Sequence, residues 1–420
     1  MIALLVICSF VTGFTYRDPG NGRHTALGGV DLLRMRMISA VSGGGKGAAA
    51  DLAPIETYWN VISYVDSHYY GEKPKPRQLT YAAIRGMMGA LGDRYTRFMD
   101  PDEYKEMNEE TRGDFEGIGA QLGEKNGGIY IQKTYDDTPA QRANLKSQDV
   151  ILKVDDKLVQ GMEIQDVVKL IRGPRGTKVR LTIKRSDTPA PFDVELTRDT
   201  VAFRIVEFRM EDTANKIGYI ALRQFNDKSD EMIYEALSDL DSQGARALIL
   251  DLRNNPGGVL DSAVSIGSRF IRDGDVVVIQ NKGGRRSAIP VDPSKHSFAA
   301  RPLVVLVDRG TASASEIVAG AIQDHKAGTL IGNESFGKGF VQQIMPLEGR
   351  CAIAITTAKY LTPNGHEVTL SQKIKPDIVV EPTDEDLKNE NDVQLKRAVQ
   401  FLKEKLGAAT TAEATPGQKT

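Results

Sequence analysis

Two hydrophobic patterns alternate along most of the chain, and together they predict its helices and strands. Apolar residues spaced three and four positions apart are typical of amphipathic helices. Short apolar runs, or apolar residues at every second position, are typical of strands. The helical pattern covers residues 54–70, 79–91, 139–143, 164–171, 230–242, 260–270 and 391–406, and two further stretches that end near residues 110 and 322. The strand pattern covers residues 117–122, 129–131, 149–155, 179–183, 217–222, 247–252, 276–280, 302–307, 340–344, 351–356 and 359–363.

The order of these elements divides the chain into regions. Helices alone are expected in residues 51–112, and strands with two short helices in residues 113–203. Strands and helices alternate in residues 204–382, which predicts an α/β core for a multidomain chain. A helical segment follows at residues 383–406. The tail at residues 407–420 is rich in Ala, Thr and Gly, and we expect it to be disordered.

The N-terminal region differs from the rest of the chain. An apolar run within residues 1–16 is too short for a conventional membrane-spanning helix and has the length of a signal-peptide core. No Lys or Arg precedes it, and no A-x-A site follows at the usual distance. The run is compatible with a secretion signal, a weak membrane anchor or a disordered apolar end. Of these interpretations we favour the secretion signal. Residues 17–50 are rich in Gly and Ala and are typical of a linker.

The composition excludes several classes of protein. With 420 residues the chain is long enough for two or three domains. It is 40% hydrophobic and 26% charged, and its net charge of −2 gives no indication of nucleic-acid binding. The two cysteines, Cys8 and Cys351, lie in apolar stretches, so we expect neither a disulfide nor a metal site.

A candidate nucleophile lies where a strand gives way to a helix. Ser313 stands in the run Thr-Ala-Ser-Ala-Ser-Glu that follows the apolar strand of residues 302–307. Such a turn exposes the hydroxyl group, and the N-terminus of the helix offers N–H groups to an oxyanion. The alternative is that Ser313 only caps the helix, which is the commoner role of such a serine.

A serine nucleophile needs a base. The histidines are His24, His68, His296, His325 and His366, and none stands in a recognisable triad motif. His325 follows Ser313 by twelve positions, which is roughly 18 Å along a continuous helix. Lys338 lies between Gly337 and Gly339 and could be enclosed. A lysine acts as a base only when its pKa falls from about 10.4; otherwise Lys338 is a solvated loop residue.

The same stretch partly matches a phosphate-binding loop. Residues 332–338 fit G-x-x-x-x-G-K, but the next residue is Gly339 instead of Ser or Thr. A strand pattern follows the motif, whereas a phosphate loop opens a helix. Nucleotide binding is therefore disfavoured.

A second candidate element ends the strand at residues 247–252. The sequence Asp-Leu-Arg-Asn-Asn-Pro-Gly-Gly covers residues 251–258. A Gly257-Gly258 turn at a strand end presents backbone N–H groups, one of which could form an oxyanion hole with the N–H of Ala314. The alternative is a tight turn and helix cap, and both roles are compatible.

The combination of these motifs resembles the C-terminal processing peptidases, or tail-specific proteases. The resemblance extends over roughly residues 50–400 and rests on T-A-S-A-S-E, the following G-K-G, the glutamine four residues later and D-L-R-x-N-x-G-G. It implies that Ser313 is the nucleophile, that Lys338 is the general base and that Gln342 orients the lysine. It also implies a core of the Clp-protease and crotonase type, with no metal or organic cofactor.

The resemblance further implies an inserted PDZ domain in residues 113–203. In such domains a glycine-containing loop binds a terminal carboxylate, and the peptide adds as a strand. The matching loop consists of Gly117, Ile118, Gly119 and Ala120. Arg172, at the end of the second PDZ helix, is implied to sense the bound substrate, although a basic residue there also suits the helix dipole.

These features together imply a serine endopeptidase that recognises protein substrates at their C-termini. The resemblance also implies an extracytoplasmic location, in the periplasm or cell envelope, a homodimer to which residues 51–112 contribute, and an activating adaptor or lipoprotein partner. Two other functions stay open: a catalytically silent PDZ scaffold, and a crotonase-like enzyme acting on an acyl thioester. Turnover of an unstructured polypeptide compared with an acyl-CoA would discriminate between them.

Overall fold

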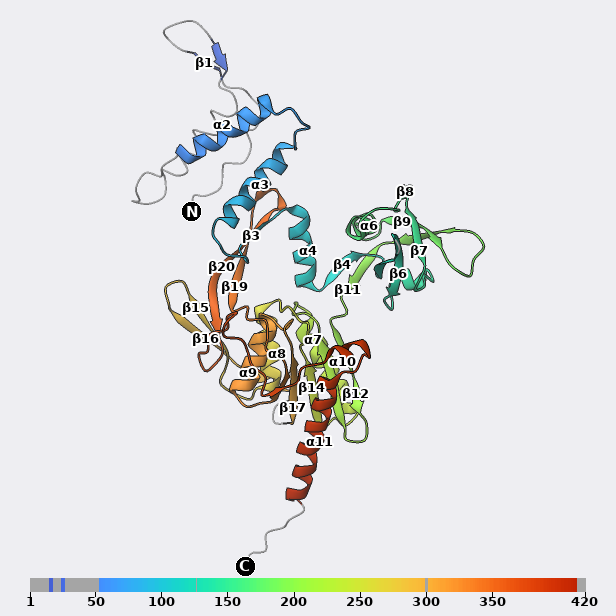
Figure 1. Cartoon of the computed structure of the whole chain (residues 1–420), viewed down its shortest axis with the longest axis vertical. Coiled ribbons are helices and arrows are strands. Elements are labelled where there is room, and N and C mark those ends of the chain that lie inside the picture. The colour runs from blue at the N-terminus through green and yellow to red at the C-terminus, as the bar shows by residue number, and fades with distance from the viewer. Residues whose placement is uncertain (1–14, 18–23, 27–52, 126, 299–300, 414–420) are drawn as a thin grey trace, which may run out of the picture. The chain divides into compact units, whose positions relative to one another are not determined.

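The computed structural model describes residues 15–17, 24–26, 53–125, 127–298 and 301–413. The chain divides into two units, residues 1–79 and 80–420. The first unit holds an antiparallel pair of strands and one long helix (Figure 1), namely β1 (Thr15–Arg17), β2 (His24–Ala26) and α2 (Ala53–His68). The strand pair was not expected, because most of it falls in the predicted linker. The predicted signal core lies outside the described residues.

The second unit is built on a six-stranded core sheet. Its order is β12-β13-β14-β17-β18-β21, with the first strand antiparallel and the others parallel. Every residue of β13, β14 and β17 is buried, as expected for parallel strands covered on both faces. This arrangement confirms the predicted α/β core. The strands are β12 (Val206–Asp212), β13 (Ile217–Leu222), β14 (Ala247–Asp251), β17 (Leu303–Val307), β18 (Thr329–Gly332) and β21 (Ile378–Val379).

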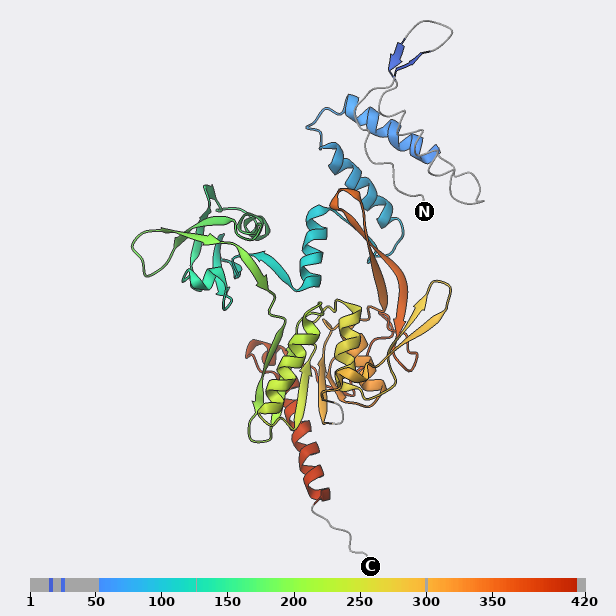
Figure 2. The same ribbon diagram turned by 180° about the vertical axis from the view of Figure 1, so that it is seen from behind.

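Helices cover the two faces of this sheet because successive strand residues point to opposite sides. Leu248 and Leu250 pack in the cluster that includes α7 (Ser229–Ser242), α8 (Leu260–Phe270) and α9 (Ala314–Asp324). Ile249, between the two leucines, packs instead with α11 (Val393–Glu413). Figure 1 and Figure 2 show α7, α8 and α9 gathered on one side of the strands.

A second, antiparallel sheet lies beside the core sheet in order β16-β15-β20-β19, and a short strand, β3, pairs with β20. The prediction of two strands at residues 351–356 and 359–363 is wrong, because β20 is continuous. Thr357 interrupts the apolar pattern as the extra residue of a bulge opposite Val341 and Gln342. The strands are β3 (Arg97–Met99), β15 (Asp275–Asn281), β16 (Arg286–Pro290), β19 (Phe340–Pro346) and β20 (Ala352–Leu361).

The region predicted as a PDZ domain forms its own sheet in order β10-β9-β7-β6-β5, with β8 beside β7. The single strand predicted at residues 117–122 is wrong. The chain turns at Gly119, whose φ of 76° suits glycine, and thereby splits the segment into β4 and β5. The strands of this sheet are β5 (Ala120–Lys125), β6 (Gly128–Thr134), β7 (Val150–Val154), β8 (Lys157–Leu158), β9 (Lys178–Lys184) and β10 (Phe192–Thr197). A separate antiparallel pair consists of β4 (Asp114–Gly117) and β11 (Asp199–Ala202). The two helices are α5 (Pro139–Arg142) and α6 (Ile164–Ile171).

The remaining helices connect or flank these sheets. They are α3 (Pro76–Gly89), α4 (Pro101–Arg112), α10 (Asp384–Lys388) and the 3-10 turns η1 (Pro293–Lys295) and η2 (Glu348–Arg350). The prediction that disorder begins at residue 407 is wrong for residues 407–413, because α11 continues to Glu413 through alanines, which favour helix. In the described part of the chain, no helix combines the length and apolar character needed to cross a membrane.

Candidate active site

Ser313 occupies a sharp turn between β17 and α9. Its φ of 56° and ψ of −118° are unusual for a residue other than glycine. Such a strained turn from strand to helix is the geometry that lifts a nucleophilic side chain out of the backbone. Ala314 is the first residue of α9, so its N–H has no acceptor within the helix.

The candidate residues of the core meet around one cavity of about 410 Å³. Six residues singled out from the sequence line this cavity: Ser313, Lys338, Gln342, Gly257, Gly258 and Ala314. Most of the remaining wall is apolar, including Met107, Phe225, Leu260, Ile317, Phe340 and Ile344. A cavity with an apolar wall and a few polar groups suits an extended peptide.

The environment of Lys338 favours a neutral amine. Burial lowers the pKa of Lys338, and the nearby positive charges of Arg97 and Arg94 lower it further, against the opposing effect of Glu316. The amine lies over the ring of Tyr95, with Nζ 5.1 Å from the ring centroid. A lowered pKa is the direction of shift that a general-base role requires.

The candidate catalytic residues line one cavity without hydrogen bonds between their side chains among the described residues. Among the residues that the structure describes, no hydrogen bond joins Lys338 Nζ to Ser313 Oγ. Gln342 is turned toward β20, where its Nε2 donates to Thr356 Oγ1 over 3.4 Å. His325 follows the end of α9, and its Nε2 lies 2.7 Å from the carbonyl oxygen of Asp275. Lysine is therefore the better candidate for the base.

The turn at Gly257 and Gly258 packs directly on Ser313. A side chain at Gly257 would lie 2.7 Å from the carbonyl oxygen of Ala312 and 2.8 Å from the nitrogen of Ala314, so only glycine fits there. The N–H of Gly257 donates to Asn255 Oδ1 over 2.9 Å. This bond leaves Gly258 as the better partner of Ala314 in an oxyanion hole.

Glu316 holds the two halves of the site together, and the sequence reasoning missed it. It is fully buried, and its carboxylate accepts hydrogen bonds from the backbone N–H groups of Ser313 at 2.8 Å, Gly337 at 2.7 Å and Lys338 at 2.9 Å. Ser335 and Tyr360 also donate to it. The S-x-x-E spacing of a capping box from Ser313 was the available signal.

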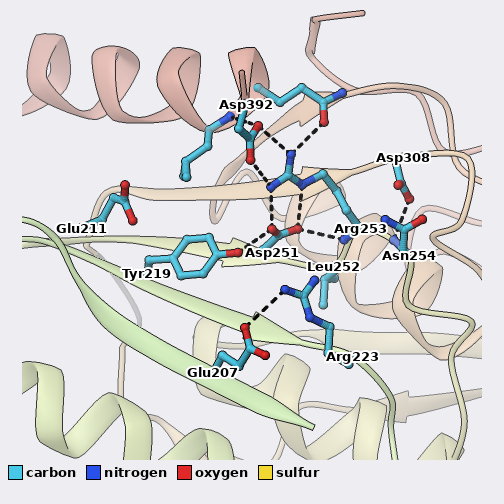
Figure 3. A network of polar contacts seen from close by, with 12 residues as sticks. Glu207, Glu211, Tyr219, Arg223, Asp251, Leu252, Arg253, Asn254, Asp308 and Asp392 are labelled. Atoms are coloured by element: carbon cyan, nitrogen blue, oxygen red, sulfur yellow. Dashed lines mark hydrogen bonds and ion pairs between the residues drawn. The ribbon is translucent and has the colours of Figure 1, made fainter. Parts of the chain in front are cut away.

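A buried ionic network supports the strand end that leads to Gly257 (Figure 3). Arg253 Nη2 donates to Asp251 over 2.7 Å and to Asp392 over 2.8 Å, and the hydroxyl of Tyr219 donates to Asp251 over 2.7 Å. Burial lowers the pKa of Arg253, but its bonds to Asp251 and Asp392 outweigh that effect and raise it. Asp392 immediately precedes α11, so the network fastens this helix to the D-L-R motif.

The predicted peptide-binding residues meet around a second, smaller cavity of about 150 Å³. Gly117, Ile118, Gly119, Ala120 and Arg172 all line it. β5 lies at one end of its sheet, so its outer edge is open to a further strand.

Arg172 is fixed between two partners at this cavity. Its Nη1 donates to Glu109 Oε2 of α4 over 2.9 Å, and its guanidinium lies 4.7 Å from the centroid of the Phe115 ring. Glu109 is 2% exposed, so this ion pair is shielded from water on the carboxylate side. Arg172 thus links the second cavity to the helix that also lines the first one through Met107.

Comparison with known proteins places these features in a family. The model of peptidase family S41 matches residues 216–380, and that of the PDZ domain matches residues 131–185. A carboxy-terminal-processing protease of Bartonella bacilliformis is 38% identical over 314 residues, which are 73% of this chain and 71% of that protein. The carboxy-terminal processing protease CtpA of Bacillus subtilis is 35% identical over 342 residues, 81% of this chain and 72% of that protein.

Two solved structures are also similar to the chain. A photosystem II D1 C-terminal processing protease is 29% identical with a TM-score of 0.48, over 88% of this chain and 98% of that one. A putative S41 protease from Bacteroides fragilis shares the fold with a TM-score of 0.52 at 15% identity, over 82% of this chain and 97% of that one. The chain therefore belongs to peptidase family S41, and it is a carboxy-terminal processing serine protease with a PDZ domain.

Proposed function

We propose that Ser313 and Lys338 form the catalytic dyad of this protease. The observation that carries the proposal is the shared cavity in which a serine on a strained turn faces a lysine whose pKa is lowered by burial and by Arg97 and Arg94. The neutral amine of Lys338 accepts the proton of the Ser313 hydroxyl as its oxygen attacks the scissile carbonyl carbon. Gln342 turns from Thr356 to orient the amine.

The remaining steps use the same groups. The N–H groups of Gly258 and Ala314 stabilise the negative oxygen of the tetrahedral intermediate. The Lys338 ammonium gives its proton to the leaving amine as the peptide bond breaks, which leaves an acyl-enzyme on Ser313. Water then attacks the ester carbonyl while Lys338 accepts a proton from that water. The Lys338 ammonium returns the proton to Ser313 Oγ as the ester bond breaks, which releases the second product and regenerates the neutral amine.

The PDZ domain is proposed to capture the C-terminus of the substrate. The open edge of β5 would pair with an extended peptide, and the loop of residues 117–120 would bind the terminal carboxylate. Arg172 offers a positive charge at the same cavity. A carboxylate that competes for Arg172 would weaken its bond to Glu109 on α4.

The direct test is cleavage of an unfolded protein with an apolar C-terminus. We expect the wild type to cleave it, and Ser313→Ala and Lys338→Ala to be folded by circular dichroism yet inactive. The same substrate with an amidated C-terminus should be cleaved at least about tenfold more slowly, because a charge-assisted contact is lost. Wild-type rates in Lys338→Ala would refute the dyad, and equal cleavage of both substrates would refute C-terminal capture.

Three further proposals concern partners and location. An activating adaptor or lipoprotein would connect the separated catalytic groups, and adding candidate partners to an inactive wild type would test it. A homodimer is supported by the exposed apolar residues of α2, including Ile55, Val61 and Tyr64. An extracytoplasmic location follows from the apolar N-terminal run, and cell fractionation would test it.

A further inference from the structure

The short segment between α3 and β3 lies against the proposed base. It comprises residues 93–97, the last of which begins β3, and it belongs to the region that the resemblance implied to contribute to a homodimer. β3 pairs with β20 through Arg97 and Ala354, which brings the segment onto the sheet that carries the catalytic loop. The segment therefore lies close to Lys338, whose Nζ is 5.1 Å from the centroid of the Tyr95 ring.

A set of hydrogen bonds fixes the backbone of this segment. Asp93 accepts from the N–H of Tyr95 over 2.9 Å and from Thr96 Oγ1 over 2.6 Å. Thr96 Oγ1 in turn accepts from the N–H of Thr356 over 3.1 Å, and Thr356 Oγ1 accepts from Gln342. Thr96 is 7% exposed. The segment is thus tied to the residue that now holds the Gln342 side chain.

Two cationic side chains lie near the ring of Tyr95. Lys338 Nζ is 5.1 Å from the ring centroid, and Arg94 Cζ is also 5.1 Å from it. Arg94 lies in addition over the ring of Phe336, 5.4 Å from its centroid, and Tyr95 packs at 6.0 Å on Phe340. These aromatic contacts enclose both sides of the Phe-Gly-Lys-Gly-Phe loop that bears the base.

The charges around Lys338 do not cancel. Arg94 and Arg97 act from this segment, and Glu316 acts from α9 with the opposite sign. Glu110 of α4 lines the same cavity as Lys338. Burial raises the pKa of Glu110, and the negative charge of Glu106 raises it further, so the neutral form of Glu110 is favoured. Tyr360 of β20 is fully buried, and burial raises the pKa of its hydroxyl, so it stays uncharged. An aromatic face attracts an ammonium group, and the two guanidinium groups oppose that attraction.

We propose that residues 94–97 are part of the catalytic site, as positioning residues of the base. The Tyr95 ring seats the Lys338 side chain, and the guanidinium groups of Arg94 and Arg97 disfavour the charged form of its amine. This inference rests on the proposed role of Lys338 as the base. It gives a physical reason why the pKa of Lys338 is lowered although the buried carboxylate of Glu316 opposes that shift.

The first test is the pH dependence of kcat/KM for cleavage of a fluorogenic peptide. The acid limb is the part of the profile in which kcat/KM rises with pH as Lys338 loses its proton. Arg97→Gln and Arg94→Gln each remove a positive charge near Lys338, so each should move this limb to higher pH. Activity at neutral pH should fall by about threefold or more, and the maximum at high pH should be retained. Arg97→Lys, which keeps the charge, should restore the wild-type limb. Arg285→Gln, on the turn between β15 and β16, is the matched control. Loss of activity at all pH values without movement of the limb would overturn the electrostatic role.

The aromatic ring requires a separate pair of variants. Tyr95→Leu removes the flat face on which the lysine rests and should lower kcat about tenfold or more with little change in KM. Tyr95→Phe keeps the ring and should retain nearly full kcat. Equal loss in both variants would show that the hydroxyl group, and not the ring, is what the site needs.

A measurement that needs no turnover separates this inference from the proposed protease mechanism. The Ser313→Ala protein labelled with [ε-¹³C]lysine is titrated by NMR, with the Lys338 resonance assigned by its loss in Lys338→Met. Adding Arg97→Gln should raise the titration midpoint of that resonance. Identical midpoints would refute the inference even if the enzyme cleaves peptides, and a raised midpoint would support it even if the dyad assignment fails.

Discussion

At the scale of single residues, the site depends on one buried carboxylate. Glu316 accepts hydrogen bonds from five donors, and three of them are backbone N–H groups of the serine turn and the lysine loop. A buried charge is costly unless such bonds satisfy it. Here the same bonds fix Ser313 relative to Lys338, so the charge that opposes a neutral lysine also sets the geometry of the pair.

We therefore predict that Glu316→Gln is more damaging than its similar size suggests. The amide has one acceptor oxygen, and its NH₂ group would face N–H donors. Buried donors left without acceptors cost about 1–3 kcal/mol each. We expect kcat/KM to fall by about 100-fold, and urea unfolding to show a loss of stability.

The matched control is Glu334→Gln, an exposed carboxyl on the same loop that faces Lys375 over 3.9 Å. Exposed ion pairs contribute little, so this variant should retain activity and stability. If Glu316→Gln were as active as the control, the carboxylate would not be what aligns the two loops.

At the scale of elements, the hydrogen bonds of Arg253 to Asp251 and Asp392 connect the C-terminal helix α11 to the strand end that leads to the Gly257-Gly258 turn. Asp392 accepts from Arg253 and, through the N–H of Leu395, also caps α11. Burial raises the pKa of Asp392, but the bonds from Arg253 and the backbone outweigh it and hold the pKa below its usual range. A carboxyl whose pKa is lower in the folded state stabilises the fold at neutral pH, and this stabilisation disappears as the pH falls.

We predict that Asp392→Ala destabilises the protein by about 1–3 kcal/mol at neutral pH, through the lost cap and the unpaired side of Arg253. The difference in free energy of unfolding between this variant and the wild type, measured with urea, should become smaller as the pH falls into the range where carboxyl groups are protonated. Glu381→Ala is the comparison. Glu381 and Asp392 line one cavity on the surface, but Glu381 is exposed to solvent and pairs with Arg309 only at 3.8 Å. Equal effects of both substitutions would contradict a special role for the network.

The elements also show what sequence patterns can and cannot predict. β13, α6 and α8 were predicted at their observed bounds, because continuous apolar runs and helical spacing reflect burial that is local to the element. β20 was split and residues 117–122 were merged, because a bulge at Thr357 and a turn at Gly119 depend on pairing with distant strands. Local patterns carry no information about such partners.

The same limit applied to the site. Ser313, Lys338 and the Gly257-Gly258 turn stand in motifs, so they could be named from the sequence. The contacts of Tyr95 with Lys338 and of Asp392 with Arg253 join segments far apart in the chain. No motif or residue spacing in the sequence predicts these contacts. The assignment of catalytic roles and the division into domains stay predictions, and the variants above address the roles.

At the scale of the whole molecule, α2 presents large apolar side chains that are largely exposed in the described part of the chain. Val61 is 56% exposed and Tyr64 is 66% exposed, and they lie on one side of the helix at a spacing of three residues. Large side chains of this kind on one helical face usually mark an interface. A second copy of the chain would cover the face by presenting the same helix.

We predict that this face forms the dimer interface. A glutamate placed at Val61 or Tyr64 would be buried without a partner on association, at a cost of several kcal/mol. The Val61→Glu/Tyr64→Glu protein should therefore sediment as a monomer at concentrations where the wild type is a dimer, with a dissociation constant raised by about 100-fold or more. Ser63→Glu adds a charge at an exposed position about 100° around the helix from Tyr64 and about 160° from Val61, and it should leave the wild-type dimer intact. If both proteins dimerise equally, the apolar face of α2 has another partner, and the homodimer proposal loses its structural support.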